Sequence, residues 1–305
     1  MTSEGATRLD VATELLGSLG RVDEPIGPRT TYRVGGRASI FVELERGVDL
    51  APLCAAVRES GLPLLVLGNG SNMLIAEAGF VGICVMLGKS YEYVELAAVS
   101  VTAGASTSLP VLARRAAADG RETLAWMVGV PGSVGGAVAM NAGGHGSEVA
   151  RELVSATVVD LLNGSVQVRE ADAFEFAYRH ARLSPSEVVL EATFAAPKGD
   201  PEGAAAAIEE IVRWRREHQP GGRNAGSIFQ NPEGDSAGRI LDELGLKGMR
   251  VRGAEISEKH ANFIQLDAEG SSDDVAELIA QVIEIVAERT GIRLTPEVRR
   301  VGFAR

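Results

Sequence analysis

Residues 64–75 read Leu64-Leu65-Val66-Leu67-Gly68-Asn69-Gly70-Ser71-Asn72-Met73-Leu74-Ile75, a glycine-rich pentapeptide between two short apolar runs. Glycine lets a backbone turn sharply and approach a ligand closely, because no side chain intervenes. Successive backbone N–H groups in such a turn form a concave site for an anion. The common dinucleotide fingerprint leads from a strand into a helix, whereas this pentapeptide leads into a second apolar run. The pattern therefore predicts strand, loop and strand.

A second glycine-rich stretch runs from Gly129 to Gly144. It reads Gly129-Val130-Pro131-Gly132-Ser133-Val134-Gly135-Gly136 and continues to Asn141-Ala142-Gly143-Gly144. A single Gly-Asn-Gly is often only a tight turn, and the chain is rich in glycine throughout. Two such stretches with Ser and Asn donors favour a cofactor diphosphate that main-chain amides hold without a Rossmann helix.

Composition narrows the class of protein. The chain has 305 residues, 45% of them apolar and 23% charged, and a formal net charge of −11, so we expect a globular protein of two or three domains. A nucleic-acid binder would be basic. The cluster Arg213-Trp214-Arg215-Arg216 is more typical of a solvated helix end.

Cys54 and Cys84 match neither a metal spacing nor a disulfide framework, which fits a reducing cytoplasm. We expect no metal site. The first residues lack the pattern of a signal peptide, and no apolar run reaches the ~20 residues of a membrane helix.

Periodicity predicts an α+β protein in three parts. Helices are expected at 7–19, 48–60, 108–119, 204–218 and 271–290, and strands at 38–44 and 187–196. Asn163-Gly164 predicts a hairpin between 154–162 and 166–169. The parts are a lobe at 1–90, to which the tail 298–305 returns, a second lobe at 91–197, and a domain at 204–297 beyond the linker 197–203.

Three polar residues stand in unusual surroundings. Arg179 lies in an apolar neighbourhood, Ser227 lies among small residues before Phe229-Gln230-Asn231-Pro232, and Glu297 follows Pro296. Each has a structural alternative: an ion pair between domains for Arg179, a turn cap for Ser227, and a surface pair with Arg299 or Arg300 for Glu297. The four histidines are scattered and show no Ser-His-Asp pattern.

Eight motifs from Thr30 to Gly302, in the family's order, resemble the UDP-N-acetylmuramate dehydrogenases, also called UDP-N-acetylenolpyruvoylglucosamine reductases. They are Thr30-Thr31-Tyr32-Arg33-Val34-Gly35-Gly36, the two glycine-rich stretches, Phe176-Ala177-Tyr178-Arg179, Ala225-Gly226-Ser227-Ile228-Phe229-Gln230-Asn231-Pro232, Gly245-Leu246-Lys247-Gly248, Ser257-Glu258-Lys259-His260-Ala261-Asn262-Phe263 and Pro296-Glu297-Val298-Arg299. The resemblance implies a two-lobed FAD module of the vanillyl-alcohol-oxidase type followed by a smaller α/β substrate domain.

The resemblance also implies an activity. NADPH would reduce non-covalent FAD, and the reduced flavin would reduce a UDP-sugar enolpyruvyl ether in peptidoglycan precursor synthesis. Arg179 would stabilise the charge that grows on the substrate carboxylate, and Ser227 would donate the proton. Glu297 would help to stabilise the intermediate, most sensibly as a protonated acid with a raised pKa.

The resemblance assigns further residues. Those expected to hold FAD are Arg33, Gly68, Asn69, Gly70, Ser71, Asn72, Gly129, Pro131, Gly132, Ser133, Gly135, Gly136, Asn141 and Gly143. Those expected to contact the substrate are Tyr178, Asn231, Lys247, His260 and Asn262. The chain departs from the family at Gln230 and at His180-Ala181, and the short segment after Arg182 fits the form that lacks a covering tyrosine loop.

Two other functions are compatible with parts of this sequence. An oxygen-using flavin oxidase of the same fold often binds FAD through a loop histidine, and Gly68–Asn72 contains none. A catalytically silent nucleotide-binding protein would be free to lose Arg179, Ser227 or Glu297, yet all are present.

Overall fold

The computed structural model describes residues 3–303, which form two compact units. Unit 1 comprises the chain up to Glu24, Ala38–Asn69 and Val81–Trp214, and unit 2 comprises Pro25–Arg37, Gly70–Phe80 and the chain from Arg215 onward. The division into 1–90, 91–197 and 204–297 stays a prediction, since each unit combines separate stretches of the chain. Residues 1, 2, 304 and 305, at the ends of the predicted first lobe and tail, lie outside the described residues.

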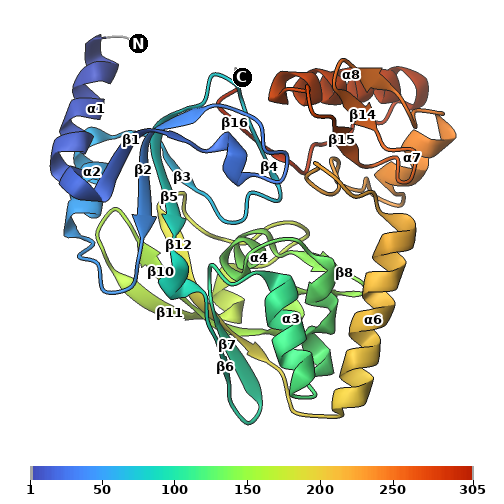
Figure 1. Ribbon diagram of the computed structural model, residues 1–305, viewed down its shortest axis with the longest axis horizontal. Helices are drawn as coiled ribbons and strands as arrows, with labels where there is room; N and C mark the ends of the chain where they lie inside the picture. The colour runs from blue at the N-terminus through green and yellow to red at the C-terminus, as the bar shows by residue number, and fades with distance from the viewer. Residues whose placement is uncertain (1–2, 304–305) are drawn as a thin grey trace. The chain divides into compact units, whose positions relative to one another are not determined.

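The first sheet of unit 1 has the order β1-β2-β5-β3. Its strands are β1 (Gly20–Pro25), β2 (Arg37–Leu44), β3 (Leu64–Val66) and β5 (Phe80–Leu87), with α1 (Ser3–Leu16) and α2 (Ala51–Ser60) alongside (Figure 1). Leu53, Cys54 and Val57 bury one face of α2, as their helical spacing predicts. The predicted helix 7–19 is wrong at its end, because Gly17 adopts φ 50° and residues Gly17–Leu19 form a 3₁₀ turn.

The second sheet of unit 1 has the order β11-β10-β12-β7-β6. The strands are β6 (Val94–Leu96), β7 (Ser100–Gly104), β10 (Leu153–Asp160), β11 (Val166–Glu170) and β12 (Glu187–Ala195) (Figure 1). The predicted hairpin is confirmed, with Gly164 at φ 76° in its turn. Helix α3 (Leu109–Ala118) and α4 (Val134–Met140) cover this sheet, and α4 packs on β12 and β7.

The second glycine-rich stretch is not a loop throughout, because part of it forms a helix. A 3₁₀ helix, η4, spans Glu122–Gly129, and α4 begins directly after Ser133, whose side chain accepts a bond from the Gly136 N–H at 3.3 Å. The helix forms because Val134, Ala137 and Val138 bury one side of it. The strand pair β8 (Gly143–Gly144) and β9 (Ser147–Glu148) and the short helix α5 (Val149–Glu152) follow.

Unit 2 has its own core of Tyr32, Leu74, Ile228, Phe229 and the apolar side of α8. Its elements are β4 (Met73–Ile75), α7 (Ala237–Glu243), β13 (Arg250–Val251), β14 (Ala254–Ile256), β15 (Ile264–Leu266), α8 (Ser272–Thr290) and β16 (Arg299–Val301). Strand β16 pairs in parallel with β4. Helix α6 (Pro201–His218) starts inside the predicted linker and runs from unit 1 into unit 2.

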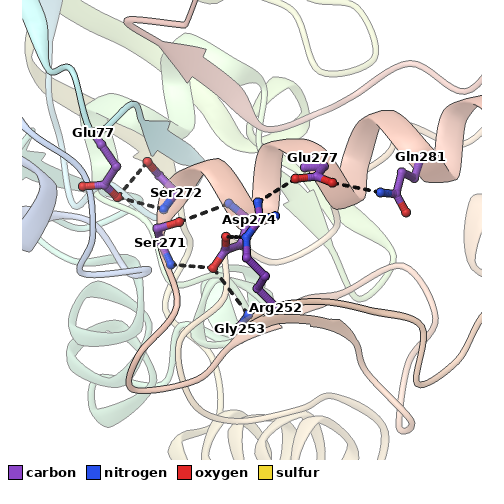
Figure 2. Close-up of polar contacts among 8 residues, drawn as sticks. All are labelled: Glu77, Arg252, Gly253, Ser271, Ser272, Asp274, Glu277 and Gln281. Atoms are coloured by element: carbon purple, nitrogen blue, oxygen red, sulfur yellow. Dashed lines mark hydrogen bonds and ion pairs between the residues drawn. The ribbon is translucent and has the colours of Figure 1, made fainter.

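The start of α8 is fixed by a capping box (Figure 2). Ser271 accepts from the Asp274 N–H at 3.2 Å, and Asp274 accepts from the Ser271 N–H at 3.0 Å. Glu77, in the turn after β4, accepts from both the N–H and the hydroxyl of Ser272, at 2.9 and 3.0 Å. This contact ties α8 to a segment nearly 200 residues earlier in the chain.

Candidate active site

Unit 2 brings Ser227 and Glu297 together from distant parts of the sequence. The Glu297 N–H donates to the Ile228 carbonyl at 2.7 Å, and the Gln230 N–H donates to the Thr295 carbonyl at 2.9 Å. The side chains of Ser227 and Glu297 are both half-buried. The residues on which the predicted chemistry depends are thus held by neighbouring backbone segments.

The first glycine-rich loop ends at the same place. The Asn72 side chain donates to the Glu297 carbonyl at 3.2 Å, and the Arg299 N–H donates to the Asn72 carbonyl at 3.0 Å. A residue predicted to hold the cofactor therefore fixes the backbone of a residue predicted to act in catalysis.

Asn262 supports the Ser227 segment from the other side. Its amide accepts from the Phe229 N–H and donates to the Phe229 carbonyl, each at 2.9 Å, and its own carbonyl accepts from the Ile228 N–H at 2.9 Å. The residue is 4% exposed. Both polar atoms of this side chain, predicted to contact substrate, are thus engaged within the protein.

Arg179 lies in unit 1 on a tight turn. Ala177 and His180 exchange two backbone hydrogen bonds, each at 3.0 Å, and Arg179 adopts φ 56°. The guanidinium carbon lies 5.1 Å from the ring centre of Tyr178, which is 52% exposed. Tyr178 is therefore available to a ligand.

The two glycine-rich stretches meet in unit 1. A Cβ at Gly68 would lie 2.6 Å from the Ser133 hydroxyl oxygen. A Cβ at Gly135 would lie 2.9 Å from the Cβ of Ala105. In unit 2, Gly70 adopts φ 59°, and a Cβ there would lie 2.6 Å from the Thr30 Cα. A side chain at Gly70 or Gly135 would clash with atoms that cannot turn away, whereas at Gly68 the Ser133 hydroxyl would have to move. The loops thus present bare backbone, as a diphosphate site requires.

Among the buried side-chain polar atoms of the described residues, two that lack a protein partner lie next to these stretches. One is the Thr31 hydroxyl oxygen, whose residue donates its N–H to the Gly70 carbonyl at 3.3 Å. The other is the Trp126 indole nitrogen, three residues before Gly129. A buried donor without a partner costs about 1–3 kcal/mol, so a ligand with acceptor oxygens fits here. The motifs marked Thr31 without giving it a role, and Trp126 had no sequence signal.

Lys247 and His260 lie close enough to affect each other. Burial lowers the pKa of His260, and the Lys247 charge lowers it further, while Asp242 opposes this. The imidazole is therefore neutral at neutral pH. Its Nδ1 accepts from the Asn262 N–H at 3.2 Å, so Nε2 carries the proton and is a donor. Lys247 pairs with Asp242 at 2.7 Å.

Other predicted residues have backbone roles. Arg33 is exposed at φ 59°, and its N–H donates to Thr30. Asn231 accepts from the Ala237 N–H at 3.1 Å, which helps to start α7. Asn141 bonds to Ala177 and Ala150.

Two family models match this chain. Residues 38–169 match the family described as "FAD binding domain", and residues 217–301 match "UDP-N-acetylenolpyruvoylglucosamine reductase, C-terminal domain". UDP-N-acetylenolpyruvoylglucosamine reductase of Geobacter metallireducens is 39% identical over 95% of this chain and 96% of its own. The reductase of Synechococcus sp. strain RCC307 is 40% identical over 92% of this chain and 94% of its own.

Among solved structures, the reductase of Thermus caldophilus is 34% identical and superposes with a TM-score of 0.80, over 92% of this chain and 99% of its own. The fold and the matched domains define an FAD-dependent oxidoreductase of the α+β type. The chain belongs to the UDP-N-acetylenolpyruvoylglucosamine reductase family. No helix in residues 3–303 has the length and apolarity needed to span a bilayer.

Proposed function

We propose that this chain catalyses the NADPH-dependent reduction of UDP-N-acetylglucosamine enolpyruvate to UDP-N-acetylmuramate, in the cytoplasm. The observation that carries the proposal is that, in unit 2, Glu297 is hydrogen-bonded both to Ile228, the neighbour of Ser227, and to Asn72. The family relationship supports the same reaction. The product would serve peptidoglycan precursor synthesis.

FAD fits the glycine-rich backbone and the unpartnered Thr31 and Trp126 groups; when bound, it supplies the hydride carrier between NADPH and the substrate's methylene carbon. Gly68, Gly70 and Asn72, with Ser133 and Gly135, would hold it. Because these loops contain no histidine or cysteine, the link would be non-covalent.

The protein's own residues would then handle charge and proton. Arg179 would bind the substrate carboxylate and stabilise the negative charge that develops there. Ser227 would give its proton to the α-carbon, a step that a weak acid can perform when the acceptor is a strong base and the hydroxyl is held in place. Glu297 in its protonated form would add a hydrogen bond to the same charge.

The substrate's nucleotide end would meet Lys247, the exposed ring of Tyr178 and the His260 Nε2–H. A lysine ammonium suits a diphosphate as a point charge. Asn262 would act by holding the Ser227 segment, because its amide is engaged at both ends with Phe229.

Stopped-flow kinetics of Ser227→Ala tests the proposal. The proton is needed only after hydride reaches the substrate, so reduction of the flavin by NADPH should be unchanged. Reoxidation by the enolpyruvyl substrate should fall by roughly 10²–10⁴-fold. Ser184→Ala, at an exposed serine of unit 1, should change neither half-reaction. An equal loss in both half-reactions for Ser227→Ala would assign that serine a structural role and remove it from the mechanism.

A further inference from the structure

The backbone of Arg179 is in a conformation that arginine does not favour. It is the third residue of the turn Ala177–His180, with φ 56°. Turns with positive φ at this position favour glycine or asparagine, because a larger side chain crowds the following carbonyl oxygen there. The surrounding structure must therefore hold this turn.

Asn141 provides that hold. Its side-chain amide donates to the Ala177 carbonyl at 3.0 Å, and its side-chain oxygen accepts from the Ala150 N–H at 2.9 Å. It is 1% exposed and ends α4 at φ 43°. The side chain thus joins the end of α4 and the start of α5 to the turn that carries Arg179.

The chemistry of asparagine matches this place. Asparagine tolerates the left-handed conformation and carries both the donor and the acceptor that the bridge uses. The bridge uses one of the two amide hydrogens and one lone pair of the oxygen, so the contact of Asn141 with FAD stays a prediction.

We propose that Asn141 is a positioning residue, which fixes the guanidinium of Arg179 by holding the carbonyl of Ala177. The inference rests on the catalytic role proposed for Arg179. Asn141, which lies 38 residues before Arg179 in the sequence, would thus affect the half-reaction with the substrate.

The variant Asn141→Gly tests this in the holoenzyme, since glycine keeps the positive φ and removes only the amide. Hydrogen exchange at Ala177 and His180 should quicken, because their paired bonds lose support. Flavin reoxidation by the enolpyruvyl substrate should slow by roughly 10- to 100-fold, as expected for a displaced charge, and this rate should fall much more than the rate of flavin reduction by NADPH. Asn163→Gly is the matched control, since Asn163 also donates and accepts across a turn, at 2.8 Å in each bond, and should leave both rates unchanged.

Combining Asn141→Gly with Arg179→Ala decides how the residue acts. If it acts through Arg179, the double variant should reoxidise at nearly the rate of Arg179→Ala alone. Full additivity, or equal slowing of both half-reactions by Asn141→Gly, overturns the inference. A slow Arg179→Ala beside an unaffected Asn141→Gly also overturns it and leaves the proposed function intact. An unaffected Arg179→Ala removes the assumed role of Arg179 and so refutes both.

Discussion

Lys247 shows how a single charge can be divided between the protein and a ligand. Its ammonium pairs with Asp242 at 2.7 Å, and its side chain keeps 29% exposure. The pair is partly solvated, so the interaction is weak and leaves the charge able to bind a diphosphate. The glycines at 245 and 248, both at positive φ, turn the chain sharply on either side of it.

We expect Lys247→Ala to raise the Michaelis constant for the UDP-sugar much more than it lowers turnover. A contact made equally in the ground state and the transition state contributes to binding alone. Steady-state kinetics with each substrate varied should show a smaller change for NADPH. Lys198→Ala removes a comparable pair, with Asp119 at 2.9 Å, and should change neither constant. A UDP-sugar constant within about twofold of the parent value would make Lys247 a surface residue.

At the residue scale, the sequence indicates candidate site residues better than it indicates the hydrogen-bond partners of those residues. Ser227 and Glu297 were singled out by their neighbours, but the bond from Glu297 to Ile228 joins positions that no local pattern relates. Asn262, predicted to contact substrate, bonds to Phe229 at both ends of its amide, which its sequence does not indicate. Nothing in the local sequence marks Arg121, which is 2% exposed and donates to the carbonyls of Ala97, Ser100 and Ala196. Such roles depend on tertiary contacts, which one sequence does not display.

Helix α8 shows what a cap contributes at the scale of an element (Figure 2). Asp274 accepts from the Ser271 N–H and pairs with Arg252 at 2.6 Å. Burial alone would raise the pKa of Asp274, but these hydrogen bonds outweigh burial and hold its pKa below the ordinary value. Because the folded pKa is depressed, the stabilisation is complete above about pH 4, the unfolded value, and is lost as the pH falls through the folded value.

We expect Asp274→Asn to lower the free energy of unfolding by about 1–2 kcal/mol at pH 7. Denaturant unfolding followed from pH 7 down to pH 3 should show the parent and the variant converging, since protonation removes the same charge. Asp273→Asn makes the same change at an exposed position of the same turn and should have little effect. A difference that stays constant across this pH range would exclude the charge of Asp274 as its cause.

Elements with strong local signals were predicted well. The apolar residues Leu53, Cys54 and Val57 at helical spacing predict α2, and Asn163-Gly164 predicts the hairpin. Helix α4 was missed because Gly135 and Gly136 disfavour helix and only burial against β12 and β7 stabilises it. The strands β13, β14 and β15 are two or three residues long, too short for a periodic pattern.

For the whole molecule, we expect FAD to be bound tightly without a covalent bond. The two glycine-rich stretches offer amides, and neither the pentapeptide Gly68–Asn72 nor its flanking strands carry histidine. Acid precipitation of the yellow protein should therefore leave the flavin spectrum in the supernatant. Colour that stays with the precipitate would mean a covalent link elsewhere in the chain.

The sequence could not show how the chain is shared between the two units. Segments Pro25–Arg37 and Gly70–Phe80 lie within the predicted first lobe, yet they pack in unit 2 with the chain from Arg215 onward. The fully buried Tyr32 is the anchor of the first, since its hydroxyl donates to the Ile264 carbonyl at 3.0 Å. A sequence pattern read along the chain predicts domains made of continuous stretches. The packing of these two segments in unit 2 becomes visible only in three dimensions.

The pairing of β4 with β16 also sets an order of events during synthesis. Met73 leaves the ribosome early, but its partner Arg299 is made 226 residues later, which at usual elongation rates means a wait of roughly 10–45 s. Throughout that time the edge of β4 is open, and the Asn72–Glu297 bond cannot form. A nascent chain released before Glu297 would thus lack a proposed catalytic group and the strand that closes this edge, so that incomplete chains would be inactive and prone to aggregate.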